Sequence, residues 1–136
     1  MNKERIINLT RLLDERGNLS VIEQLKDIPF EIKRTYWVYD VPGGEARHGH
    51  AYHRNEEFIV ALSGSFDVLT DDGVQQNIYS LNRSYYGLFV PHGIWRTLQN
   101  FSTNSLALII ASTPYDENDY IFDHELFVKL KNNHGG

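Results

Sequence analysis

The stretch Gly44–Gly64 reads GEARHGHAYHRNEEFIVALSG and combines polar, proton-exchanging side chains with an apolar run. His50 and Tyr52 are two residues apart, so an extended strand places both side chains on one face and that of His53 on the other. Glu57 opens the apolar run EFIVAL, which a Ser-Gly pair ends. The stretch therefore predicts β-structure that carries His50, Tyr52 and Glu57 in apolar surroundings.

Short β-rich runs separated by turn residues continue on both sides of this stretch. Turn signals such as Pro42-Gly43-Gly44 and Asp71-Asp72-Gly73 interrupt the runs. About eight strands are predicted, over residues 19–23, 32–40, 57–62, 66–70, 78–81, 87–90, 94–98 and 106–111. Strands at such close spacing are typical of a sandwich or barrel, so the predicted fold class is all-β.

The C-terminal run differs from the rest of the chain. Apolar residues recur at helical spacing at Phe122, Leu126, Phe127 and Leu130, which predicts a short amphipathic helix over residues 123–131. The acidic loop Asp116–Asp119 is expected to cap it. We expect one domain over residues 1–131, and a disordered polar tail over residues 132–136.

Composition excludes several classes of protein. The chain has 136 residues, 13 Lys and Arg against 18 Asp and Glu, and no cysteine. The lack of cysteine excludes disulfides, Cys-ligated zinc, iron–sulfur clusters and a thiol nucleophile. The formal charge of −5 argues against nucleic-acid binding through bulk charge. No window resembles a secretory signal or the ~20 apolar residues of a membrane span, so a cytoplasmic protein without a membrane partner is expected.

Two spacings in the sequence resemble the motifs of the cupin superfamily. The first cupin motif is G-x5-H-x-H-x3–4-E-x6-G, which Gly44–Gly64 matches except that Tyr52 stands in place of the second His. The second motif ends in P-x-G-x2-H-x3-N, which residues 91–100 match except that Arg96 stands in place of the His. This resemblance implies a cupin-type antiparallel β-barrel or jelly roll.

The two replacements change what the pocket can hold. A metal cupin binds its ion through three His and one Glu, and the matching positions here are His50, Tyr52, Glu57 and Arg96. Arg96 is a permanent cation and cannot act as a metal ligand. We therefore expect a metal-free pocket in which Arg96 supplies the positive charge.

Beyond the superfamily, the sequence resembles the WxcM-like sugar 3,4-ketoisomerases, which act on TDP-linked 4-keto-6-deoxy sugars. The matching words include residues 28–34, 41–45, 62–65, 71–73, 86–88, 100–102 and 115–121. The resemblance implies transfer of the keto group from C4 to C3 through an enediol(ate), without metal or redox cofactor. It also implies a role in deoxyamino-sugar biosynthesis for cell-surface polysaccharides such as O-antigen. A homodimer, commonly with an exchanged N-terminal strand, is implied as well.

The resemblance assigns chemical roles to the motif residues. His50 falls on the favoured base, and imidazole suits the task because its pKa of about 6.5 lets it carry a proton both ways. Tyr52 is a poor base at neutral pH, so we expect it to orient the substrate or donate a proton. Glu57 either orients His50 or pairs with an arginine in the lumen, and the pairing is favoured. Arg96 is expected to face the substrate.

Other residues are expected to bind the nucleotide part of the substrate. Arg47, near the pocket mouth, and Arg34 are the candidates for the diphosphate, because a guanidinium offers a planar pair of donors. Tyr36 falls on a position near the nucleotide, and Arg16 on one near the sugar. Trp37 points to the face opposite Tyr36 in a regular strand, so it is expected in a core or an interface.

Three rival functions share this scaffold. A nucleotide-sugar 3,5-epimerase would use a similar His base with a Tyr acid, which Tyr52 fits. A non-catalytic cupin that binds a nucleotide sugar is a second alternative, and a metal-dependent cupin, opposed by Arg96, is a third. The pair Arg16 and Arg96 does not select the galacto or the gluco configuration at C4.

Overall fold

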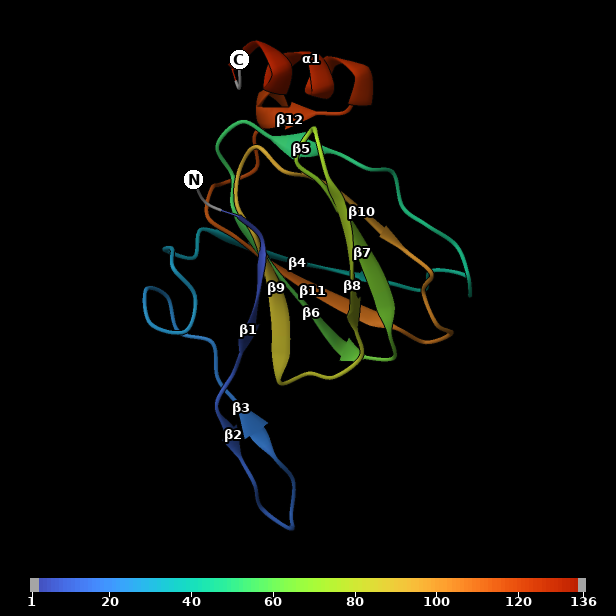
Figure 1. Ribbon diagram of the computed structural model, residues 1–136. Coiled ribbons are helices and arrows are strands. Elements are labelled where there is room, and N and C mark those ends of the chain that lie inside the picture. The colour runs from blue at the N-terminus through green and yellow to red at the C-terminus, as the bar shows by residue number, and fades with distance from the viewer. Residues whose placement is uncertain (1–2, 135–136) are drawn as a thin grey trace.

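The computed structural model describes residues 3–134, which form mainly β-strands with one helix near the C-terminal end (Figure 1). In chain order the strands are β1 Arg5–Asn8, β2 Arg11–Leu12, β3 Leu19–Ser20, β4 Arg34–Tyr39, β5 Ala51–Tyr52, β6 Glu57–Ser63, β7 Phe66–Asp71, β8 Gln76–Leu81, β9 Tyr86–Val90, β10 Trp95–Gln99, β11 Leu106–Ala111 and β12 Tyr120–Ile121. A 3-10 turn, η1 Glu117–Asp119, precedes β12, and the helix α1 spans His124–His134.

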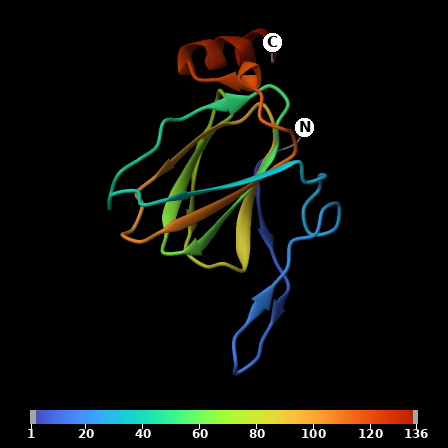
Figure 2. The same cartoon turned by 180° about the vertical axis from the view of Figure 1, so that it is seen from behind.

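Two antiparallel sheets face each other and enclose the core (Figure 2). The larger sheet has the order β1-β9-β6-β11-β4, and the smaller has the order β10-β7-β8. Two short pairs, β12-β5 and β2-β3, lie outside these sheets. The arrangement confirms the expected all-β, cupin-type fold with a short C-terminal helix.

Burial along the strands follows the side-chain alternation of a sheet with one covered face. In β7, Phe66 and Val68 are buried while Asp67 and Leu69 are only half-buried. Side chains from both sheets form one core, with buried members Ile59, Ala61, Phe66, Val68, Leu81, Leu88, Val90, Ile94, Leu98, Phe101, Ala107 and Ile109. Each large aliphatic or aromatic side chain buried there stabilises the fold by about 1.5–3 kcal/mol.

The outer face of the larger sheet carries an apolar patch over β4, β6 and β11. The patch consists of Trp37, Tyr39, Leu62, Leu106 and Leu108, which line a shallow groove. Trp37 and Tyr39 are 57% and 63% exposed, whereas their neighbours in β4, Tyr36 and Val38, pack against the core on the inner face. The prediction that Trp37 faces away from Tyr36 is therefore confirmed, whereas the alternative that it lies in the core is wrong.

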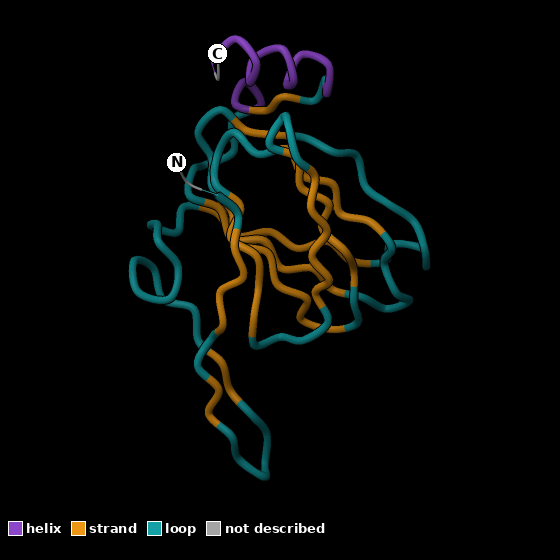
Figure 3. Tube along the Cα trace, viewed as in Figure 1, coloured by secondary structure: helices purple, strands orange, loops and turns teal. Residues whose placement is uncertain are grey.

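All eight predicted strands exist, although the first is shorter than expected (Figure 3). The segment predicted over residues 19–23 pairs only at Leu19–Ser20. Four strands were not predicted: β1, β2, β5 and β12. Three of these are only two residues long, too short for a periodic pattern. β1 completes the edge of the larger sheet by pairing with β9, from Arg5–Phe89 to Asn8–Tyr86.

Strands β2 and β3 form a hairpin that extends away from the barrel (Figure 1). Every residue from 10 to 21 is exposed, including Leu12 at 57%, Leu13 at 67% and Leu19 at 55%. At the turn, Arg16 donates to Asp14 at 3.0 Å, and both side chains lie in solvent. The hairpin thus exposes apolar side chains and an arginine on the surface of the chain.

The C-terminal helix begins and ends later than the sequence suggested. Asp123 caps its first turn by accepting from the backbone N–H of Glu125 at 3.0 Å, so Phe122 lies before the helix. The helix continues past Lys131 to His134. Asn132 and Asn133 lower the stability of a helix less than glycine does, and the Gly-Gly pair comes only after His134. Residues 132–134 are therefore helical, and the end of the expected tail lies outside the described residues. Among residues 3–134, no helix has the length and apolar character needed to cross a membrane.

Candidate active site

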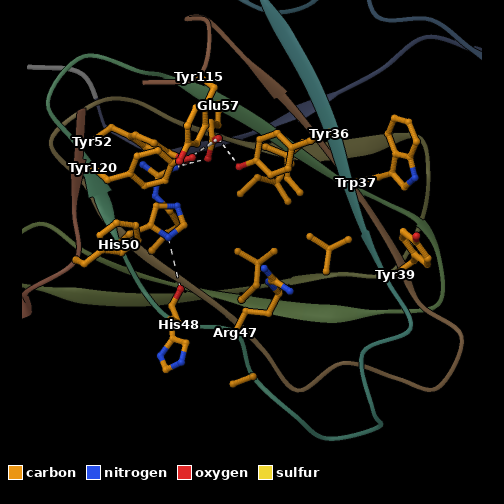
Figure 4. Close-up of a pocket in the computed structure, with 17 residues that line it drawn as sticks. Tyr36, Trp37, Tyr39, Arg47, His48, His50, Tyr52, Glu57, Tyr115 and Tyr120 are labelled. Atoms are coloured by element: carbon orange, nitrogen blue, oxygen red, sulfur yellow. Dashed lines mark hydrogen bonds and ion pairs between the residues drawn. The ribbon is translucent and has the colours of Figure 1, made fainter. Parts of the chain in front are cut away.

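A cavity of about 720 Å³ lies between the sheets, and Figure 4 shows the side chains that line it. Its walls come from β4, β5, β6 and β10, from the segment before β5, and from residues 115–122. The sequence-predicted residues that line it are Tyr36, Arg47, His50, Tyr52, Glu57 and Arg96. The structure thus brings six of the eight predicted site residues to one cavity.

A backbone bridge joins the two sequence motifs at this cavity. The N–H of His50 donates to the carbonyl of Arg96 at 3.0 Å, and the N–H of Arg96 donates back to His50 at 2.9 Å. Gly49 permits this close approach, because a Cβ there would lie 2.6 Å from the Trp95 Nε1 atom and 2.5 Å from the Thr97 hydroxyl. The glycine before His50 is therefore required by packing.

His50 has the features of a neutral base. Its Nδ1 lies 3.5 Å from the carbonyl oxygen of His48, which favours the tautomer with the proton on Nδ1. Its Nε2 is buried and has no hydrogen-bond partner among the described residues. Burial, together with the charges of Arg96 and Arg47, lowers the pKa of His50 to about 3. The imidazole is therefore neutral at neutral pH, and its Nε2 lone pair carries neither a proton nor a hydrogen bond from the described residues.

Tyr52 is buried against the floor of the cavity and is only 1% exposed. Its hydroxyl donates to Glu57 Oε2 at 3.2 Å, and its ring meets the His50 ring edge-on at 5.0 Å. Burial and the nearby Glu57 carboxylate raise the pKa of the Tyr52 phenol. Tyr52 therefore keeps its proton at neutral pH and donates a hydrogen bond to Glu57.

Glu57 and Arg96 form a buried ion pair beneath Tyr52. Arg96 Nη1 donates to Glu57 Oε1 at 2.7 Å, and Arg96 Nη2 donates to the Ile94 carbonyl at 3.0 Å. The two side chains are 0% and 2% exposed, and the guanidinium lies 5.0 Å from the centre of the Tyr52 ring. The favoured pairing of Glu57 with a lumenal arginine is confirmed. Arg96 lines the cavity, but its side chain is fully buried by the protein.

The second oxygen of Glu57 accepts from three donors: Tyr36 at 2.6 Å, Asn55 at 3.2 Å and Tyr52 at 3.2 Å. Burial and the Glu57 carboxylate raise the pKa of the Tyr36 phenol. Asn55, which sequence reasoning missed, is fully buried and also accepts from the backbone N–H groups of Ser112 and Thr113. Its position two residues before Glu57, on the same face of an extended segment, was the available signal.

The two predicted diphosphate-binding arginines lie in different surroundings. Arg47 lines the cavity and is exposed, and its backbone N–H donates to the Leu98 carbonyl at 2.9 Å. Arg34 lies behind two aromatic side chains, 5.4 Å from the Tyr36 ring and 5.6 Å from the Tyr115 ring. Its Nε is buried without a partner among the described residues. Only Arg47 therefore meets the cavity directly.

Arg16 does not reach the cavity of its own chain. It lies at the turn of the β2–β3 hairpin, which points away from the end of the barrel where the cavity opens (Figure 1). Its guanidinium pairs with Asp14 in solvent instead. Any contact of Arg16 with a bound sugar therefore requires a second chain.

An aromatic wall completes the cavity and was not predicted. Tyr120 and Phe122 line it beside His50, with ring centres 5.5 and 6.2 Å from the imidazole, and Tyr115 lies 5.9 Å from Tyr120. The sequence analysis counted Phe122 in the apolar pattern of the helix predicted over residues 123–131, because its spacing to Leu126 is helical. The Asp123 cap removes Phe122 from the helix and leaves it on the wall.

The acidic loop has a different role from the one expected. Asp116 caps η1 by accepting from the Asn118 N–H at 3.0 Å, and does not cap α1. Asp119 accepts from the backbone N–H groups of Arg54 and Asn55 at 2.8 and 3.0 Å. The loop therefore fixes the segment before Glu57. In the described part of the chain, no group of three or more His, Asp and Glu side chains is arranged to hold a metal ion.

Comparison with known proteins identifies the family of this chain. A family model described as FdtA, WxcM-like, C-terminal matches residues 2–132. A TDP-4-oxo-6-deoxy-alpha-D-glucose-3,4-oxoisomerase from Aneurinibacillus thermoaerophilus is 38% identical over 127 residues, which cover 93% of this chain and 91% of the relative.

Solved structures agree with the sequence relatives. A 3,4-ketoisomerase from Helicobacter canadensis is 38% identical with a TM-score of 0.92, over 95% of this chain and 97% of its own. A variant of the ketoisomerase QdtA from Thermoanaerobacterium thermosaccharolyticum, in complex with TDP-4-keto-6-deoxyglucose, is 27% identical with a TM-score of 0.94, over 98% and 96%. The chain therefore belongs to the WxcM-like family of sugar 3,4-ketoisomerases.

Proposed function

We propose that this protein is a TDP-4-keto-6-deoxyhexose 3,4-ketoisomerase that moves the keto group from C4 to C3 by general acid–base catalysis. The observation that carries the proposal is the neutral His50 imidazole, whose buried Nε2 has no partner among the described residues of a cavity wall. Relatives of 38% identity carry this activity in their names.

The reaction needs one base and one proton donor at neighbouring carbons. His50 Nε2 takes the proton from C3, and the electron pair of the broken C–H bond moves to form a C3–C4 double bond and an oxyanion at O4. The proton of the C3 hydroxyl then passes to O4, C4 takes up a proton, and the electron pair on O3 forms the carbonyl, which leaves a ketone at C3 and a hydroxyl at C4. His50, which holds the abstracted proton, is the group placed to return it at C4.

Charge near the developing oxyanion comes from the floor of the cavity. Arg96 carries a permanent positive charge close to the Tyr52 ring, where a metal cupin would hold its ion. Tyr52 keeps its proton and can hydrogen-bond an oxyanion if its contact with Glu57 is exchanged for the substrate. We therefore infer a mechanism that uses no metal.

The nucleotide is assigned to the mouth of the cavity. Arg47 is the exposed cation nearest to His50 on the lining and binds the diphosphate. Arg34 adds charge from behind Tyr36 and Tyr115, and Tyr36 orients the nucleotide end while its hydroxyl remains on Glu57.

A homodimer would give the N-terminal hairpin and the apolar patch a common purpose. The hairpin exposes Leu12, Leu13 and Leu19, and the outer sheet exposes Trp37 and Tyr39. Contact between copies would bury both sets of apolar side chains.

Such a dimer also accounts for the Arg16 prediction, because the hairpin could carry Arg16 to the sugar site of the second copy. The cytoplasmic location, the role in deoxyamino-sugar and cell-surface polysaccharide biosynthesis and the configuration at C4 stay predictions.

The decisive experiment is an NMR time course with TDP-4-keto-6-deoxyglucose in deuterated buffer, run beside a His50→Asn variant. We expect the 3-keto sugar to appear with the wild type alone, and product that receives the abstracted proton from His50 at C4 shows the H4–H5 coupling that reports its configuration. Deuterium at C5 would instead indicate the 3,5-epimerase. Binding without turnover would indicate a non-catalytic nucleotide-sugar-binding protein, and Tyr52→His would then be the variant to test.

A further inference from the structure

The segment that closes the cavity next to His50 alternates between two environments. In β12, Ile121 pairs with Ala51 of β5 and packs into the small core beneath α1. Tyr120 and Phe122, on either side of Ile121, instead line the cavity. The alternation of an extended segment therefore presents two aromatic rings to whatever the cavity binds.

The two rings form an offset stack beside the base. Tyr120 and Phe122 are stacked with ring centres 5.1 Å apart and an angle of 13° between their planes. Their ring centres lie 5.5 and 6.2 Å from that of His50. Phe122 is 65% exposed, although phenylalanine is among the residues most often buried in a core.

Contacts on the helix side hold this stack in place. His124, two residues after Phe122, has its Nε2 2.8 Å from Asp71 Oδ2 of β7. Phe127 is 1% exposed and packs against the Trp95 ring, with centres 5.7 Å apart. The exposed Phe122 ring therefore extends from a segment that is anchored to the barrel on both sides.

We propose that Phe122, stacked on Tyr120, is a specificity residue that contacts the deoxygenated C6 side of the hexose and disfavours a 6-hydroxyl. The proposal rests on the proposed function, because His50 can take the C3 proton only if the hexose lies within reach of its ring. A phenyl ring offers no hydrogen-bond partner, so a methyl group against it is favoured and a hydroxyl loses its hydrogen bonds to water.

The test uses two ligands that bind without reacting, because each carries a hydroxyl at C4 in place of the ketone. Calorimetry with TDP-6-deoxyglucose, TDP-glucose and TDP alone gives three dissociation constants for each variant. For the wild type we expect TDP-6-deoxyglucose to bind about tenfold more tightly than TDP-glucose. Phe122→Ala should reduce this ratio to about one and leave the affinity for TDP unchanged.

Two further variants separate the role of the ring from a loss of folding. Leu126→Ala removes an exposed apolar side chain, 47% exposed, that does not line the cavity, and should keep the wild-type ratio. Phe122→Leu keeps an apolar surface and should retain most of the preference for the deoxy sugar. Thermal unfolding of each variant verifies that the fold is intact.

Several outcomes would overturn the assignment. An equal loss of affinity for TDP alone in Phe122→Ala would mean that the ring holds the nucleobase. A wild-type ratio near one, or an unchanged ratio in Phe122→Ala, would remove the specificity role. A wild type that binds these ligands with the expected ratio but fails to isomerise the 4-keto sugar would contradict the proposed function and leave the ligand contact standing.

Discussion

The floor and the mouth of the cavity differ in how their polar groups are satisfied. The floor consists of Tyr36, Tyr52, Asn55, Glu57 and Arg96, and the mouth consists of Arg47, Tyr115 and Phe122. In the floor, the Glu57 carboxylate receives four hydrogen bonds from buried or half-buried donors. At the mouth, side chains are exposed, with Tyr115 at 67% and Phe122 at 65%.

This difference separates stability from ligand binding. A change in the floor leaves a buried charge or donor without its partner, so its cost appears in the free energy of unfolding. A change at the mouth alters only groups that water already reaches, so its cost appears in the binding of ligand. His50 lies between the two regions, because it is partly buried but has an unpartnered nitrogen.

Replacing His50 should give the largest effect. His50→Asn keeps a small polar side chain but removes the base, so kcat should fall by about 10²- to 10⁴-fold. The dissociation constant for TDP should stay within about twofold of the wild type, because the nucleotide is assigned to the mouth. Activity that survives in this variant would mean that another group takes the C3 proton.

Replacing Arg96 should destabilise the fold through the floor of the cavity. Arg96→Met leaves Glu57 buried without its cation, so the free energy of unfolding should fall by about 3–5 kcal/mol in urea titrations. The double variant Arg96→Met with Glu57→Gln removes both charges, keeps an acceptor for Tyr36 and Tyr52, and should recover most of that loss. A single variant as stable as the wild type would show that the ion pair does not hold the floor together.

Replacing Arg47 should affect the mouth alone. Arg47→Ala should raise KM for the nucleotide sugar about tenfold with little change in kcat, because one charge-assisted contact to the diphosphate is lost. Its unfolding curve should match the wild type. Arg83→Ala, an exposed arginine away from the cavity, is the matched control and should leave KM unchanged.

The pH dependence of kcat/KM should show the smallest change. It tests whether the burial of His50 between floor and mouth lowers the pKa of its imidazole. Because the pKa of His50 is lowered to about 3, the imidazole stays neutral and kcat/KM should be flat from pH 7 to about pH 5. An ordinary imidazole would lose about thirtyfold of its neutral form over that range.

The same shift fixes the sign of the stability change. Between pH 6.5 and about 3 the unfolded chain binds more protons at His50 than the folded chain, so stability should fall as the pH falls. A kcat/KM profile that declines through pH 6.5 would contradict the lowered pKa.

The sequence was sufficient where a residue type and a spacing both carried information. The β-rich runs predicted the strands β6, β7 and β11 of a sandwich or barrel, and the motif spacings favoured a pairing of Glu57 with an arginine in the lumen. Each of these follows from the regular geometry of strands and from the need to pair a buried charge.

Other parts of the site depend on contacts that no local pattern encodes. Asn55 is important because its amide joins Glu57 to a loop more than 50 residues away. Phe122 has helical spacing to Leu126, and only the Asp123 cap decides that the helix starts after it. Arg16 belongs to a hairpin whose two-residue strands leave no periodic signal.

The hairpin that carries Arg16 also has a consequence for local unfolding. Strand β2 pairs only with β3 among the described strands, and residues 10–21 are exposed throughout. Such a segment opens at little cost while the barrel stays folded, so it is the first place where a protease can act. We expect trypsin to cut first after Arg16, and protection of that bond at high protein concentration would report its burial against a second copy.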